Sequence, residues 1–232
     1  MKIRTTTSDL DPSASEQLFL EALGRMPMFP LPGVVMFPHA LLPLHIFEER
    51  YRKMVRDLLA SHRHLAMALL ESPTDDPAVE RPAVRRVMGV GEVVMAHELP
   101  DGRFNLVVRG RARVELQEEL DTDEPYRVIV ATVRGDTEVA QPQELTDADQ
   151  TLRALVGRLA DSVPDGGELL RQVVASHATA AELADVLAAA LVVDVQKRQR
   201  LLETRDLMKR IERVTAEVVA MTGRLGPTTP TN

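Results

Sequence analysis

The chain has 232 residues, a formal net charge of −7, no cysteine and no tryptophan, and only 3% of its residues are aromatic. The absence of cysteine excludes disulfides, thiolate metal ligands and thiol nucleophiles. The acidity and the scarcity of aromatic rings argue against binding to nucleic acid or to anionic membranes. The N-terminal segment lacks the apolar core of a signal peptide and no apolar run reaches membrane-spanning length, so we expect a cytoplasmic protein.

The first 45 residues are polar and then rich in proline. Residues 1–25 are polar and then weakly helical around Glu16–Leu23, which predicts a loose N-terminal extension. Prolines recur through residues 26–45 and divide them into short extended pieces, because proline fixes φ and removes a backbone donor. The clearest of these predicted strands is GVVMF, residues 33–37.

An amphipathic helix is predicted over residues 46–61. Its apolar residues recur every three or four positions and therefore share one helical face. These residues are Phe47, Tyr51, Met54, Val55 and Leu58. Downstream, the apolar run Leu65–Leu70 predicts a buried strand, and the proline-rich segment 72–84 predicts an exposed loop.

From Val87 the chain becomes β-rich. Strands are predicted over residues 87–99, 103–108, 112–116 and 126–133. Asp101-Gly102 between the first two of these predicts a hairpin, and Gly110 predicts a break after the second. Short strands at this spacing predict a twisted sheet or a partly closed barrel.

Residues 135–146 read as a linker, and the composition beyond it has helical period. The predicted helices cover 146–162, 167–176, 179–192 and 195–222. Thr179 and Glu182 have the spacing of a capping box. The predicted organisation is an extension (1–25), a β-rich lobe with one helix (26–140), a helical lobe (141–222) and a disordered tail (223–232).

Three stretches resemble the N-terminal, substrate-binding domain of Lon proteases. Leu42–Tyr51, LPLHIFEERY, is similar to that family's run LPLHIFE-x-RY. Asp101–Arg113 is similar to its hairpin DG-R-x-N-L-x-x-x-G-x-x-R, and Gln199–Glu203 with Arg210 resembles its closing helix. The resemblance covers about residues 26–222. It implies an α+β fold with a β-rich pseudo-barrel (PUA-like) N-terminal lobe and a C-terminal helical bundle lobe.

The resemblance also implies a stand-alone, non-catalytic protein that binds unfolded or client polypeptides, with a protease as a further expected partner and an adaptor role in protein quality control. The expected peptide-binding groove has a floor of Val35, Phe37, Leu42 and Phe104 and a rim in loop 72–84. The motif residues that we expect to be structural are Pro43, His45, Phe47, Glu48, Arg50, Tyr51, Asp101, Gly102, Gly110, Leu202 and Glu203. The alternatives are an RNA-associated PUA-like module and an enzyme that uses a cleft of the β-rich lobe.

The residues argue against the enzymatic alternative. The chain contains no Gly-Lys dipeptide and therefore no P-loop. Its four lysines lie near a terminus or on predicted amphipathic helices, which argues against a Ser–Lys dyad. We expect no catalytic residues and no cofactor.

The sequence gives only weak signals for a metal site or a nucleotide site. His62 and His64 could form a metal pair, but no nearby carboxylate has convincing ligand spacing. Gly89-Val90-Gly91 lacks the third glycine of a dinucleotide loop and is better explained by a bulge or a barrel corner. The acidic run 115–124 and the basic run 197–213 are interpreted as solvated faces, the latter pairing with the acidic lobe. We expect no bound metal.

Overall fold

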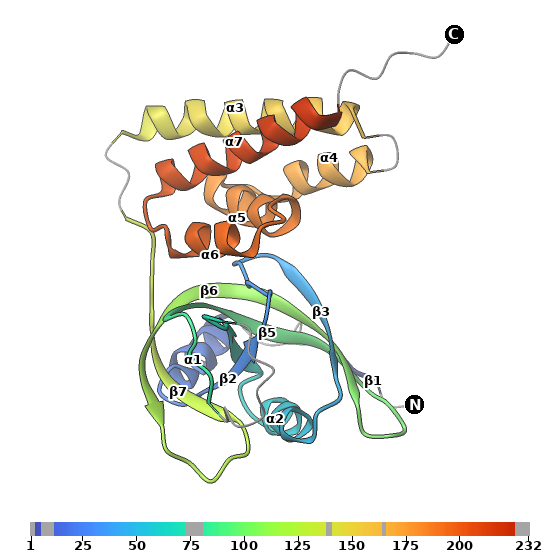
Figure 1. Cartoon of the computed structure of the whole chain (residues 1–232), viewed down its shortest axis with the longest axis vertical. Coiled ribbons are helices and arrows are strands. Elements are labelled where there is room, and N and C mark those ends of the chain that lie inside the picture. The colour runs from blue at the N-terminus through green and yellow to red at the C-terminus, as the bar shows by residue number, and fades with distance from the viewer. Residues whose placement is uncertain (1–2, 6–11, 73–80, 138–140, 164–165, 226–232) are drawn as a thin grey trace. The chain divides into compact units, whose positions relative to one another are not determined.

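The computed structural model describes residues 3–5, 12–72, 81–137, 141–163 and 166–225, and it divides the chain into two compact units. Unit 1 is Met1–Gly135 and unit 2 is Asp136–Asn232. Unit 1 holds the β-structure and two helices, and unit 2 holds five helices among the described residues (Figure 1). This is the α+β organisation that the sequence predicts.

Unit 1 is built on one mixed sheet. Among the described residues its strand order is β1-β5-β4-β2-β7-β6-β3, and an additional pairing between β5 and β6 closes the five central strands into a barrel. The pair β2–β4 is parallel and the other pairs are antiparallel. The strands are β1 (Ile3–Thr5), β2 (Met26–Leu31), β3 (Leu41–Ile46), β4 (His64–Leu69), β5 (Val87–Glu98), β6 (Phe104–Leu120) and β7 (Arg127–Val133).

Two helices pack on this barrel through their apolar faces. Helix α2 (Glu49–Ala60) buries Tyr51, Met54, Val55 and Leu58, as its periodicity predicts. Helix α1 (Pro12–Ala22) places Phe19 and Ala22 in a second core cluster with residues of the strands. The prediction of a loose extension over 1–25 is therefore wrong for the described part of that segment, because two apolar side chains anchor it.

The predicted strand over residues 33–37 is also wrong. These residues form an irregular segment between β2 and β3 in which Met36 and Phe37 are buried. The segment crosses β5 and β6 at very short range. A Cβ added at Gly110 would lie 1.8 Å from the Phe37 carbonyl oxygen, and one added at Gly89 would lie 2.0 Å from that of Met36. Gly110 therefore gives space to this crossing, and β6 continues through it without the predicted break.

The predicted hairpin after β5 is confirmed. Leu99 N–H donates to the Arg103 carbonyl at 2.8 Å and Gly102 N–H to the Leu99 carbonyl at 2.9 Å. Gly102 has a φ of 79°, in the left-handed region that glycine adopts without steric cost.

Unit 2 is a helical bundle with an apolar interior. Its helices are α3 (Pro142–Asp161), α4 (Gly167–Ser176), α5 (Ala180–Leu191), α6 (Val195–Glu203) and α7 (Leu207–Leu225). The predicted capping box of Thr179 and Glu182 starts α5. The predicted helix 195–222 is instead two helices, because Asp206 accepts from Lys209 N–H at 3.1 Å and starts a new helix. Helix α7 extends into the predicted tail, and residues 226–232 lie outside the described residues.

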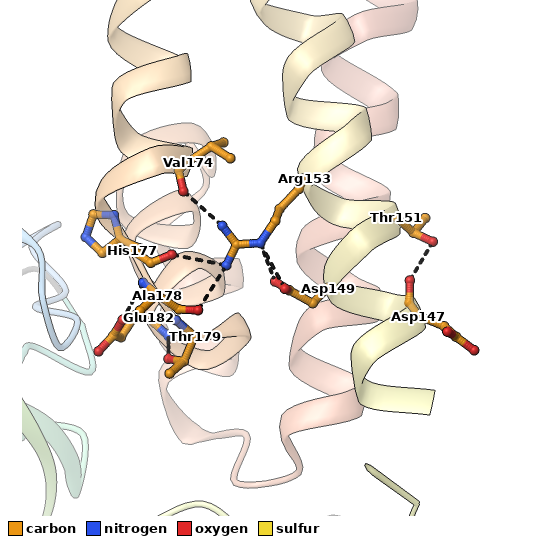
Figure 2. Close-up of polar contacts among 9 residues, drawn as sticks. All are labelled: Asp147, Asp149, Thr151, Arg153, Val174, His177, Ala178, Thr179 and Glu182. Atoms are coloured by element: carbon orange, nitrogen blue, oxygen red, sulfur yellow. Dashed lines mark hydrogen bonds and ion pairs between the residues drawn. The ribbon is translucent and has the colours of Figure 1, made fainter. Parts of the chain in front are cut away.

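Arg153 of α3 binds the C-terminal end of α4 (Figure 2). Arg153 pairs with Asp149 one turn earlier, with Nε 2.9 Å from Oδ2. Its two Nη atoms donate to backbone carbonyls at the end of α4 and just beyond it, those of Val174 at 2.9 Å and His177 at 3.1 Å. A cation at a helix C-terminus satisfies carbonyls that have no partner within the helix.

Candidate functional site

The predicted groove floor lies mostly in the core. Val35, Phe37 and Phe104 are buried, and Leu42 is half-buried and packs against the main core cluster. This set does not form an open groove, because three of its four side chains are buried in the core. Residues 73–80 of the predicted rim lie outside the described residues.

The candidate site is on the outer side of β3, β6 and β5, opposite the core. Leu42, Leu44 and Ile46 of β3 face the core that includes α2, so the alternate residues Leu41 and Pro43 face outward. The cross-strand partners of the outward residues continue this surface over β6 and β5. We call it the outer face, and it consists of Leu41, Pro43, His45, Met95, His97, Asn105 and Val107.

The outer face is apolar at its centre. Pro43, Val107 and Met95 form a row across the three strands, and they line a shallow pocket of about 400 Å³. Leu41 is 64% exposed, Phe47 63% and Met95 49%. Phe47 precedes the first residue of α2 and is exposed, so its predicted place in the buried helical stripe is wrong. Exposed apolar side chains gathered in one patch are typical of an interaction surface.

The polar residues of two sequence motifs meet at one end of this face. His45 Nδ1 lies 2.7 Å from Asn105 Oδ1, and Arg103 Nη1 lies 3.3 Å from His45 Nε2. Because a guanidinium only donates, Nε2 accepts and the proton is assigned to Nδ1, which donates to Asn105. Arg103 also pairs with Asp101 at 2.7 Å.

The hairpin tip is held on its other side by α2. Arg52 donates to the Asp101 carbonyl at 3.1 Å, and a Cβ added at Gly102 would lie 3.3 Å from Arg52 Nη1. The motif hairpin is thus fixed between His45 on β3 and Arg52 on α2. This arrangement explains why the two motif stretches carry these residue types.

The outer face is close to electrically neutral. Asp101 is paired with Arg103, and the buried Glu92 is paired with Arg109 at 3.5 Å. The neighbouring motif residues are also internally matched, since Glu48 pairs with Arg50 at 2.8 Å. A face without net charge on a chain of net charge −7 favours an uncharged ligand over an ionic one.

The remaining motif residues make contacts that stabilise the fold. The Arg50 guanidinium lies 4.6 Å from the centre of the Tyr51 ring, and burial raises the pKa of Tyr51. Leu202 is buried in unit 2, and Glu203 accepts a hydrogen bond from Gln199 at 2.9 Å.

The other candidate sites are explained by local pairing. In the part of the chain that the structure describes, no group of three or more potential ligands could hold a metal ion, and His64 is buried beneath the Phe19 ring. In the acidic run, Glu119 pairs with Arg127 at 2.6 Å. In the basic run, Lys197 pairs with Glu217 at 2.5 Å.

Comparison with known proteins settles the family. A family model described as the ATP-dependent protease La (LON) substrate-binding domain matches residues 25–220. The chain belongs to this family. Lon protease of Dictyoglomus thermophilum is 26% identical over 190 residues, and that of Heliobacterium modesticaldum is 26% identical over 212 residues. The matches cover 82% and 89% of this chain but 24% and 25% of those proteins, so the chain spans about a quarter of the length of these curated relatives.

Solved Lon N-terminal domains share the fold. The N-terminal domain of Mycobacterium avium complex Lon protease superposes with a TM-score of 0.65 at 18% identity, over 84% of this chain and 98% of that one. The Lon N-terminal domain protein from Xanthomonas campestris superposes with a TM-score of 0.57 at 23% identity, over 83% and 97%. None of the helices in the described ranges is long and apolar enough to cross a membrane.

Sequence reasoning did not single out five residues of the outer face, namely Leu41, Met95, His97, Asn105 and Val107. The alternation in residues 103–108 already separates Val107 from the core-facing residues, which is a usable signal. Met95 is not separable in this way, because a register shift between Val93 and Met95 changes the alternation of β5.

Proposed function

We propose that the chain is a non-catalytic polypeptide-binding module of the Lon substrate-binding family. Its outer face would receive exposed apolar segments of unfolded or client polypeptides. The observation that carries this proposal is the apolar row of Pro43, Val107 and half-exposed Met95 on a sheet whose other face is covered by α2. Delivery of such clients to a protease, as an adaptor in protein quality control, is the cellular role that we propose for this binding.

The size of the face fits weak and reversible binding. Burial of one large apolar side chain contributes about 1.5–3 kcal/mol, and a pocket of about 400 Å³ has room for only a few such groups. After the cost of association, this corresponds to a Kd between about 1 mM and 1 µM. Affinity in this range suits a protein that must release its clients.

The test is peptide binding with variants of one exposed residue. A fluorescein-labelled peptide of sequence GSVLVFVSG is titrated with the protein and followed by fluorescence anisotropy. Met95→Glu should weaken binding at least tenfold, because a charge must then be desolvated on the floor of the face. The matched control is Val133→Glu, which places the same charge at a residue of similar exposure on β7, away from the outer face.

Equal affinity of both variants for the peptide would contradict the proposal. A salt-dependent anisotropy change with structured RNA, in place of peptide binding, would favour the RNA-associated alternative.

A further inference from the structure

β3 is an edge strand. Among the described strands it pairs with β6 alone and stands at the end of the strand order. Its register with β6 runs without interruption from Leu41, opposite Arg109, to Ile46, opposite Phe104. One side of β3 is therefore occupied by β6, and the other side is a sheet edge.

The hydrogen-bond pattern assigns backbone groups to each side. Gly110 N–H donates to the Ala40 carbonyl at 2.8 Å, and these two residues are the next pair beyond Leu41 and Arg109 in the same register. Hydrogen-bonded and non-hydrogen-bonded pairs alternate along an antiparallel ladder. Leu42, Leu44 and Ile46 therefore face β6 with their backbone groups, whereas Leu41, Pro43 and His45 direct theirs to the edge.

An independent bond supports this assignment. The Arg103 carbonyl accepts from Leu99 N–H on the β5 side, so odd-numbered residues of β6 turn toward β5 and even-numbered residues toward β3. Proline at position 43 agrees as well, because the residue without an N–H lies on the edge side, where no ladder bond is lost.

The residues of β3 that form the sheet edge therefore also contribute to the outer face. Leu41, Pro43 and His45 present their side chains on the outer face and their backbone groups at its border. We propose that a client polypeptide binds here as an added strand, with its backbone paired to β3 and its alternate apolar side chains beside Leu41 and Pro43 at the border of the outer face. This inference rests on the proposed function and specifies its ligand as a short, extended, uncharged apolar segment.

The charges and the proline favour this occupant over others. The carboxylates that border the face, Asp101 and Glu92, are already paired with arginines, so no free charge selects an ionic partner there. A second copy of this chain is disfavoured, because a two-fold pairing of β3 centred on Pro43 would oppose two residues that lack N–H donors. A helical partner would leave the backbone groups of the edge without a partner.

The test compares two peptides that differ only in backbone donors. One is labelled GSVLVFVSG, and the other is the same peptide N-methylated at its four central amides. Strand addition predicts at least tenfold weaker binding of the methylated peptide, although its side chains are unchanged and its apolar surface is larger. On the protein side, Leu41→Pro removes an edge donor that Leu41→Ala keeps, and we expect the proline variant to bind several-fold more weakly than the alanine variant.

The outcomes separate the two proposals. If both peptides bind within twofold of each other while Met95→Glu weakens both, the outer face binds polypeptide but strand addition is wrong. If neither peptide binds, the proposed function fails and the inference fails with it. A concentration-dependent dimer in analytical ultracentrifugation that the unmethylated peptide does not dissociate would assign the edge to a second copy and overturn the inference.

Discussion

Arg210 is a buried cation that connects three parts of unit 2. It is fully buried, and its guanidinium lies 2.6 Å from Asp136 before α3 and 3.0 Å from Asp185 on α5. Its Nη1 also donates to the Thr204 carbonyl at 2.9 Å, in the break between α6 and α7. Desolvating such a group is costly, so its partners must all be present for the fold to tolerate it.

Replacing Arg210 by leucine should strongly destabilise unit 2. The change removes the Arg210 guanidinium from the buried Asp185, and breaking a buried ion pair costs about 3–5 kcal/mol of unfolding free energy. Urea denaturation followed by circular dichroism at 222 nm measures the loss. The matched control is Arg213→Leu, the same substitution three positions away, because the Arg213 guanidinium is exposed and donates to Thr204 Oγ1 at 2.8 Å. A similar loss in both variants would contradict this role for Arg210.

His64 is a buried imidazole on β4 whose two ring nitrogens have no hydrogen-bond partner among the residues that the structure describes. Burial lowers the pKa of His64 to about 4. The unfolded chain takes up a proton near pH 6.5 and the folded chain only near pH 4, so stability is complete above pH 6.5 and falls as the pH decreases between these values. Each pH unit in this window costs about 1.4 kcal/mol.

The variant His64→Phe should remove this pH dependence. Between pH 7.5 and pH 5 the wild-type protein should lose about 2 kcal/mol more than the variant, because phenylalanine cannot take up a proton in either state. Both tyrosines, Tyr51 and Tyr126, lie in unit 1, so tyrosine fluorescence in urea reports on the unit that contains His64. An identical loss in both proteins would show that other groups determine the acid sensitivity.

At the scale of elements, the crossing of residues 33–37 over β5 and β6 depends on two glycines, because any side chain at these positions would collide with the crossing backbone. Gly89 and Gly110 sit where the carbonyls of Met36 and Phe37 approach most closely. The backbone of the crossing segment cannot move away easily, because Phe37 is fully buried and His39 N–H donates to the Gly110 carbonyl at 2.9 Å. The barrel and the segment before β3 are therefore fixed together.

The substitution Gly110→Ala should be severely destabilising. Its Cβ would lie 1.8 Å from a backbone oxygen, so strand and segment must separate, and we expect a loss of more than about 3 kcal/mol. Gly24→Ala is the control in the same unit, because its Cβ would meet only one atom, the Glu21 carbonyl oxygen, at 3.8 Å. Tyrosine fluorescence in urea compares the two variants. A near-neutral effect of Gly110→Ala would contradict the close crossing.

The sequence predicts elements well where the local pattern and the tertiary structure agree. Helix α2 and the Asp101-Gly102 hairpin are examples, because periodicity and turn chemistry specify both. Strand β2 lies within the predicted extended region 26–45, but its bounds and its place between two strands were not predicted, because Pro27 and Pro30 argue against an interior strand. The break between α6 and α7 was missed because the apolar period continues through it, although Asp206 caps the new helix and Arg210 binds the Thr204 carbonyl in the break.

At the scale of the whole molecule, the fold and the family were predictable from motif residues, whereas the candidate site was only partly so. His45 and Asp101 were singled out from their motifs, and they do lie at one end of the outer face. Met95 and Val107 were not, because their proximity to Pro43 depends on pairings between distant strands. The predicted groove of buried residues shows that apolar character alone does not distinguish a core from a binding face.

The most direct test of the account is methyl NMR of protein labelled at the methionine ε-methyl groups. Met95 on the outer face is half-exposed, whereas Met28 and Met54 are fully buried and serve as internal references. Assignment of the Met95 signal uses the variant Met95→Leu. On addition of GSVLVFVSG, the account predicts a saturable shift of the Met95 signal with little change in the buried methyl groups. Saturable binding that leaves the Met95 signal unmoved would contradict the claim that the outer face is the polypeptide-binding surface.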